Sequence, residues 1–154
     1  MKPVILRMFP PNYHEIVRVF PVRNRAVLFT YGAIIYNPAG FKVPPELIEH
    51  EKVHIAQQAD VDPAAWWRLY LTNANFRLGV EIPAHKAEAE WLRSNGRKWE
   101  HVARRLASPL YGSVISEDEA VELLRDYTYD SDEAKQVAEN IQDILEQQSQ
   151  SVER

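Results

Sequence analysis

His50-Glu51-Lys52-Val53-His54, inside the stretch PELIEHEKVHIAQQA of residues 45–59, decides how this 154-residue chain is interpreted. The five residues spell H-E-x-x-H. On a helix, histidines four positions apart lie on one face, so both imidazoles can reach one metal ion. The Glu51 carboxylate can then touch a metal-bound water without ligating the metal. The alternative is an amphipathic helix that carries two histidines by coincidence, and the rest of the sequence has to separate the two interpretations.

The composition is that of one ordinary globular domain. Hydrophobic residues make up 45% of the chain and charged residues 26%, and the length is sufficient for a single core. The net charge is −4 and no basic cluster stands out, so we expect no nucleic-acid partner. Cysteine is absent, so any metal has to be held by histidine and carboxylate side chains.

The N-terminus predicts neither secretion nor membrane insertion. Residues 1–11 are apolar, but Arg7 and closely spaced prolines interrupt them, and no small-residue cleavage site follows. No apolar run approaches the length of a membrane span. We therefore expect a soluble, cytoplasmic protein without a membrane partner.

The order of the elements predicts an α+β fold. Residues 4–9, 14–20 and 26–36 are rich in Val, Ile, Phe and Tyr and predict strands, with Gly32 splitting the third segment or marking a bulge. Proline and capping signals predict helices from residue 45 onward, over 45–59, 63–71, 76–94, 98–107, and after capping boxes at 116 and 130. We expect one domain over residues 1–147, with a small, mostly antiparallel sheet (about 4–36) before a helical part. A frayed polar tail is expected over 148–154.

The predicted motif helix has two separate faces. At about 100° per residue, the metal-binding face consists of His50, His54 and Gln57. A separate apolar stripe consists of Ile48, Ile55 and Ala59. Glu51 falls between them. We expect the apolar stripe to pack and the other face to line a cleft. Gln57 and Gln58 are expected to be solvated or to support the ligands, because glutamine rarely ligates metals.

A third ligand is required, because catalytic zinc usually takes three protein ligands and keeps one position for water. Glu81, His85 and Glu88 share one face of the helix predicted downstream, and their spacing leaves all three open. Pro83 is tolerated there if the helix begins near Glu81. Glu90 is expected on a solvated face.

Further segments strengthen the case for a metal site: WWRLYL at 66–71, FRL at 76–78 and EIPAH at 81–85. Together with the H-E-x-x-H helix they resemble small phage-encoded metallopeptidase-like proteins of the gluzincin type, over about residues 26–124. The resemblance implies a zincin-like fold, a Zn²⁺ cofactor, and the glutamate of an E-x-x-A segment as third ligand. That glutamate is Glu81 here, with His85 as the alternative third ligand. Pro83 and His85 are where this chain departs from the pattern of those proteins.

The expected chemistry follows from His50, His54 and Glu81 holding zinc. The pKa of a water on the metal falls toward about 7, and Glu51 accepts its proton and passes it to the leaving amine. The resemblance implies that a strand at the sheet edge binds an extended substrate by strand addition, and residues 26–35 are the candidate here. The candidates for a donor to the oxyanion are Tyr31, Tyr36, His85 and Tyr111.

The expected function is a zinc-dependent metallopeptidase of phage or prophage origin, acting on a peptide or protein. The alternative is a virion-associated structural or assembly protein that keeps the fold and the metal site without peptidase activity, with phage structural proteins as partners. A third alternative, an inactive regulatory or binding domain, is disfavoured because Glu51 is intact. His14 and His101 are expected to be non-functional. A core role is expected for Trp66, Trp67, Tyr70 and Phe76.

Overall fold

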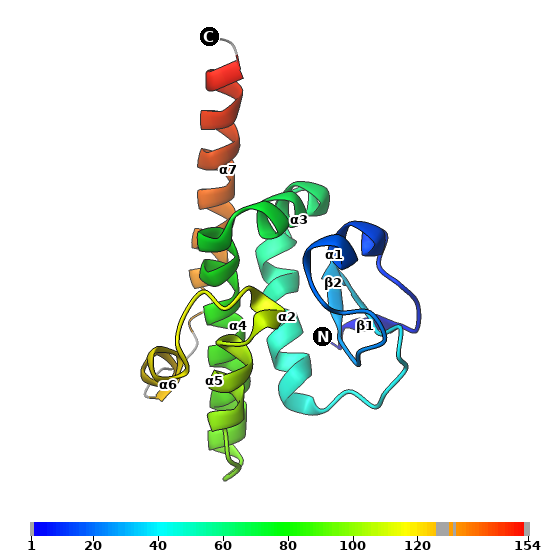
Figure 1. Ribbon diagram of the computed structural model, residues 1–154, viewed down its shortest axis with the longest axis vertical. Helices are drawn as coiled ribbons and strands as arrows, with labels where there is room; N and C mark the ends of the chain where they lie inside the picture. Colours follow the sequence, from blue (N-terminus) through cyan, green and yellow to red (C-terminus); the bar gives the residue numbers. More distant parts are fainter. Residues whose placement is uncertain (1, 126–129, 131, 153–154) are drawn as a thin grey trace.

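The computed structural model describes residues 2–125, 130 and 132–152. A small three-stranded sheet with one short helix forms the N-terminal part, and helices form the rest (Figure 1). The predicted α+β class is therefore confirmed. Among the helices in the described ranges, none is both long and apolar enough to cross a membrane.

The sheet consists of β1 (Val4–Leu6), β2 (Phe29–Tyr31) and β3 (Ile34–Tyr36) in the order β1-β3-β2. β2 and β3 form an antiparallel hairpin. Its turn contains Gly32 at φ +63°, which confirms the predicted division of this segment. β1 pairs with β3 in parallel, so the sheet is mixed, and the prediction of a mostly antiparallel sheet was wrong. The sequence separation between β1 and β3 is long enough for the crossover that a parallel pair needs.

The predicted strand at 14–20 is instead the helix α1 (Tyr13–Val19). Ile16 and Phe20 are four residues apart, and both are buried in the core, as one helical face requires. Short apolar runs fit helix and strand equally well by periodicity, and tertiary packing decides between them here.

The helical part is built largely from local signals. Asp62 accepts a hydrogen bond from the backbone N–H of Ala64 (3.0 Å), and Asn73 accepts one from Phe76 (3.0 Å), so both act as N-caps. The last helix continues to Val152 rather than ending near 147, and Figure 1 shows it projecting beyond the body. The elements are α2 (Pro45–Gln58), α3 (Pro63–Thr72), α4 (Ala74–Ser94), α5 (Glu100–Leu106), the short 3₁₀ helix η1 (Pro109–Tyr111), α6 (Glu117–Arg125) and α7 (Asp132–Val152).

Helix α4 was expected over 76–94 and runs unbroken through Pro83, so the proline is not tolerated by a helix start near Glu81. Proline removes the hydrogen bond to the carbonyl four residues earlier, which here belongs to Gly79. Gly79 is exposed, and a Cβ placed on it would meet nothing within 4 Å. The residue whose carbonyl loses its partner therefore lies at the surface, where such a loss costs least.

Helix α2 lies between the sheet and α4 (Figure 1). Its contact with α4 is lined by the buried side chains of Val53, Ala84 and Ala87. The two alanines are small, so the two helix backbones can approach closely. The main hydrophobic core lies where the sheet and α1 meet α3. The predicted aromatic cluster is part of this core: Trp66, Trp67, Tyr70 and Phe76 are all buried.

Candidate metal centre

The polar face of α2 is the buried one. His50, Glu51 and His54 are 3%, 6% and 6% exposed. The predicted packing stripe is at most half-buried at Ile48 and Ile55, and Ala59 is exposed, so the assignment of the packing face was wrong. The histidine face of α2 packs in place of the apolar stripe because α4 presents matching polar side chains to it. These buried polar groups have partners, which offsets the cost of removing them from water.

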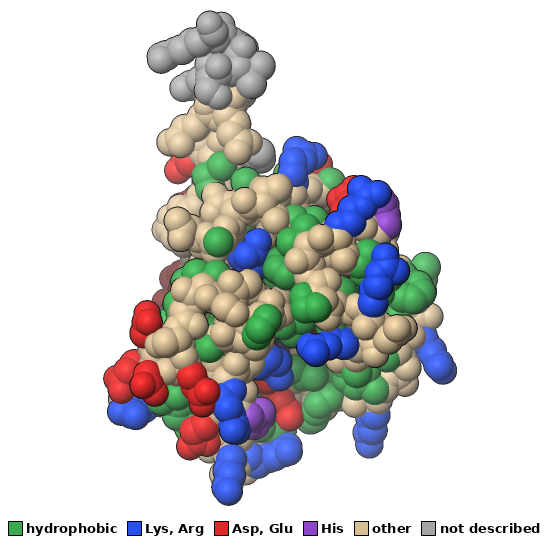
Figure 2. Space-filling model, viewed as in Figure 1, with side chains coloured by type: hydrophobic (Ala, Val, Ile, Leu, Met, Phe, Trp, Pro, Cys, Tyr) green, Lys and Arg blue, Asp and Glu red, His purple; other side chains and the backbone are tan. Residues whose placement is uncertain are grey.

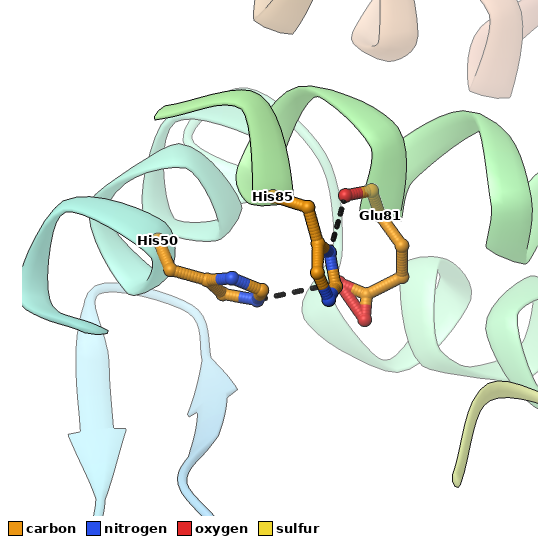
Figure 3. Close-up of side chains that lie close together, drawn as sticks. All are labelled: His50, Glu81 and His85. Atoms are coloured by element: carbon orange, nitrogen blue, oxygen red, sulfur yellow. Dashed lines mark hydrogen bonds and ion pairs between the residues drawn. The ribbon is translucent and has the colours of Figure 1, made fainter. Parts of the chain in front are cut away.

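Helix α4 places Glu81 and His85 opposite His50, as Figure 3 shows. All three residues are buried. One ligand atom from each lies within 4.8 Å of the other two, so the group could hold a metal ion. His54 falls outside this grouping, but its Nε2 is only 2.7 Å from Glu81 Oε1, and His50 Nε2 is 3.5 Å from the same oxygen. The structure thus brings both motif histidines to Glu81 and adds His85 beside them.

All three histidines are held through Nδ1, and each Nδ1 faces an atom that accepts hydrogen bonds. These atoms are Glu88 Oε1 at 2.9 Å from His50, Gln57 Oε1 at 2.9 Å from His54, and the backbone carbonyl of Glu81 at 2.8 Å from His85. The hydrogen-bond network therefore assigns the proton of each neutral ring to Nδ1 and the lone pair to Nε2. A carboxylate or carbonyl on the outer nitrogen is the arrangement that orients histidine ligands toward a metal.

The inner atoms are buried and poorly satisfied. Glu81 Oε1 and His85 Nε2 are inaccessible to solvent and have no hydrogen-bond partner. His54 Nε2 and Glu81 Oε1 are closer than two unshared lone pairs would lie, so a proton belongs between them here, and a metal ion that replaced it would need these two atoms to move apart. The other oxygen of Glu81 accepts a hydrogen bond from Tyr70 Oη at 3.0 Å, which fixes the carboxylate.

The electrostatics of the centre favour a cation. Burial alone would lower the pKa of His50, but Glu81 and Glu88 outweigh it and raise the pKa to about 10. Burial likewise opposes a rise in the pKa of His54, which Glu81 nevertheless raises. Burial would raise the pKa of Glu81, yet His54 and His50 hold it well below its usual range. Protons and a divalent ion would therefore compete for the same histidine nitrogens.

His85 behaves differently from the two motif histidines. Burial, together with the charge of His50, lowers the pKa of His85 to about 3, so its ring is neutral. Its proton lies on Nδ1, and Nε2 has only a lone pair to offer. His85 therefore cannot donate a hydrogen bond to an oxyanion, which removes it from the predicted donors.

Glu51 faces the sheet. Thr30 Oγ1 donates a 2.6 Å hydrogen bond to Glu51 Oε2, and this leaves Oε1 for another partner. Thr30 comes from β2 and was not found by sequence reasoning, because nothing local to residue 30 indicates which helix it will face. The same holds for Tyr70, whose helical position suited a purely apolar core role.

A cavity of about 60 Å³ adjoins the centre, and His50, Glu51, His54 and Glu81 line it together with Tyr111. Neither Tyr31 nor Tyr36 lines it, so Tyr111 is the predicted donor that the structure brings to the site. Burial and the charge of Glu81 raise the pKa of Tyr111 well above its usual value, so it stays protonated. The apolar part of the wall includes Phe20, Phe29, Trp66, Trp67 and Leu110.

Glu88 supports His50 and is in turn neutralised. Its carboxylate contacts the Arg105 guanidinium through both oxygens. Burial would raise the pKa of Glu88, but the His50 hydrogen bond and the Arg105 charge lower it to about 2. Glu88 is therefore an ionised carboxylate occupied by two partners, which favours a supporting role over metal ligation.

Glu88→Gln is expected to weaken zinc binding by roughly ten- to a hundredfold, as losses of ligand-orienting carboxylates do. The amide keeps the shape of the side chain but removes the charge that orients and polarises His50. Zinc affinity is measured by competition with a chromogenic chelator. Glu49→Gln is the matched control, because Glu49 lies on the same helix as His50 and pairs with Lys52 at the surface. Equal affinities in the two variants would exclude this role for Glu88.

Comparison of the chain with protein-family models, with curated proteins and with solved structures finds no match.

Proposed function

We propose that this chain is a zinc-dependent metallopeptidase in which His50, His54 and Glu81 hold Zn²⁺ and Glu51 is the general base. The observation that carries the proposal is the arrangement of the lone pairs: Nε2 atoms of oriented histidines face the buried, unsatisfied oxygen of Glu81. Imidazole and carboxylate ligands suit zinc, and three protein ligands leave one position open.

The residues divide the chemistry among themselves. Bound zinc would polarise the scissile carbonyl and acidify the attacking water. Glu51 Oε1 takes the proton of that water, since Thr30 already holds Oε2, and returns it to the leaving amine. Tyr111 donates its hydroxyl proton in a hydrogen bond to the oxygen that becomes negative. Tyr70 and Glu88 keep the Glu81 carboxylate and the His50 ring in place.

Substrate binding requires the site to open. The cavity of about 60 Å³ has room for a few water molecules but not for an extended peptide. Its wall includes Phe29 and Thr30 of β2 as well as Leu110 and Tyr111 of η1, which follows the short helix α5. We propose that η1 moves away from β2 when an extended peptide enters, which would also bring Tyr111 into contact with the peptide.

Tyr111→Phe is expected to lower kcat by roughly a hundredfold, the effect of removing one oxyanion donor, with zinc content unchanged. The phenyl ring preserves packing against His85, whose ring centroid lies 5.0 Å away. Steady-state kinetics on a fluorogenic peptide, with metal analysis of the same sample, measure both quantities. Tyr31→Phe is the control, because Tyr31 does not line this cavity. Unchanged kcat in Tyr111→Phe would remove this residue from the mechanism.

Hydrolysis of a peptide library tests the proposed function directly. Cleavage is expected with the zinc-loaded chain, is lost after treatment with a chelator, and returns when zinc is added back. A chain that carries zinc, remains folded and cleaves no peptide would contradict peptidase activity.

Closure of the site favours one alternative: a phage virion-associated structural or assembly protein in which the metal is structural. Glu81 and the three histidines around it are at most 6% exposed, and four protein ligands would close the site as in structural zinc sites. This alternative predicts the chain in purified phage particles, stoichiometric with structural proteins. Recovery of the chain only as a free protein in the host cytoplasm would favour the peptidase of phage or prophage origin.

A further inference from the structure

The edge of β2 that faces α2 is already used at one end. Thr30 C=O accepts hydrogen bonds from Gln58 Nε2 (3.1 Å) and Trp67 Nε1 (2.9 Å), and Gly32 N–H donates to Gln58 Oε1 (2.7 Å). A peptide that adds to this edge therefore cannot pair with Gly32 or with the Thr30 carbonyl. It has to lie over the residues before β2, from Ala26 to Leu28, where the Val27 N–H already donates to Arg25 C=O (3.0 Å).

A second cavity adjoins the site on this side. Its volume is about 80 Å³, and its lining includes Ala26, Leu28 and Phe41 as well as His50 and Glu51. The space beside the proposed base thus continues along the segment that is left for a substrate.

Cationic residues lie next in sequence to residues that line this second cavity. Arg25 precedes Ala26, Lys42 follows Phe41, and adjacent residues lie about 3.8 Å apart along the chain. Arg23 is held nearby by a turn in which Arg25 N–H donates to Val22 C=O (3.2 Å) and Asn24 has φ +59°. Arg23, Arg25 and Lys42 are exposed, and no ion pair joins them to a carboxylate in the described ranges. Their charges are therefore available to a ligand.

The distribution of charge over the whole chain also places positive charge in the N-terminal part. Residues 1–44 contain six Lys and Arg and one Glu, a net charge of +5, whereas residues 45–154 carry −9. Figure 2 shows the cationic side chains spread over the N-terminal part and acidic side chains gathered near α6. A field of this kind steers an anionic segment toward the N-terminal wall of the site and repels it elsewhere.

We infer that the substrate is an acidic polypeptide segment, which lies over Ala26–Leu28 with carboxylate side chains toward Arg23, Arg25 and Lys42. This inference rests on the proposed peptidase function and specifies its substrate class. An acidic polypeptide fits better than a nucleic acid, because a peptide can pair with the backbone of the residues that lead into β2 and the adjoining cavity is lined mainly by apolar side chains.

The test uses the zinc-loaded chain and matched peptides, in which Glu and Asp on either side of the cleaved bond are replaced by Gln and Asn. Acidic peptides are expected to have a kcat/KM roughly tenfold higher, with the difference shrinking at high salt. The triple variant Arg23→Gln, Arg25→Gln, Lys42→Gln is expected to lose this preference. Arg68→Gln, Lys98→Gln, Lys135→Gln makes the same change in net charge at exposed positions elsewhere and is expected to keep it.

Binding to Glu51→Gln, followed by fluorescence anisotropy, separates this inference from the proposed function. If acidic peptides bind and the triple variant binds them more weakly, the inferred docking site is supported even when nothing is hydrolysed. If neutral peptides are cleaved as well as acidic ones and the triple variant has no effect, the inference is wrong while the peptidase stands. Tighter binding of a single-stranded oligonucleotide or an anionic lipid vesicle than of the acidic peptide would also overturn it.

Discussion

Glu51→Gln is expected to reduce peptide hydrolysis by roughly 10²- to 10⁴-fold while the protein keeps about one zinc ion per chain. The amide cannot accept a proton, so the attacking water loses its base. It still fits the space of the carboxylate and can accept the Thr30 hydrogen bond through its oxygen. The fold and the metal should therefore be unaffected. Steady-state kinetics and elemental analysis of the same preparation measure the two effects.

Glu49→Gln, two residues from the base in sequence but at the surface, is the matched control and should leave both quantities unchanged. Thr30→Val is an intermediate case, since Glu51 remains a base but loses the donor that orients it. Full hydrolysis in Glu51→Gln would exclude this residue as the base. Loss of zinc in the same variant would show that Glu51 helps to hold the metal instead.

His54→Ala is expected to weaken zinc binding more than about a hundredfold, which exceeds the effect of losing a residue that only orients a ligand. His85→Ala is expected to weaken zinc binding by about tenfold at most. Both residues are buried and close to Glu81, so the comparison decides which of them completes the ligand set. His54 Nε2 lies 2.7 Å from Glu81 Oε1. His85 belongs instead to the group with His50 whose ligand atoms lie within 4.8 Å of one another.

Affinity is measured by chelator competition, with thermal unfolding as a check that each variant folds. The reverse order of effects would assign the metal to His50, Glu81 and His85, and the motif histidine at 54 would then have a structural role. Equal and large losses in both variants would indicate a site with four protein ligands, which is closed and unsuited to hydrolysis.

The parts of the fold that were predictable have local causes. Helix α2 was expected over 45–59 and spans Pro45–Gln58, because Pro45 suits a first turn. Asp62 and Asn73 cap the next two helices through their own side chains. The mixed sheet was not predictable, because β1 reaches β3 across about thirty residues of sequence. Helix α1 was missed because its burial depends on the α3 aromatics.

The candidate site divides in the same way. The spacing of His50 and His54 and the face shared by Glu81, His85 and Glu88 could be read from helical geometry. Their partners could not, because Thr30 and Arg105 reach the site from β2 and α5. The buried polar face of α2 was also unexpected, since periodicity shows that two faces differ and not which of them will pack.

Element-specific metal analysis of the purified, folded chain tests the central claim most directly, with Glu81→Ala prepared in parallel. We expect about one zinc ion per native chain and a marked loss of bound zinc in Glu81→Ala. A native chain that folds without any bound metal, and does not take up zinc when it is supplied, would contradict it.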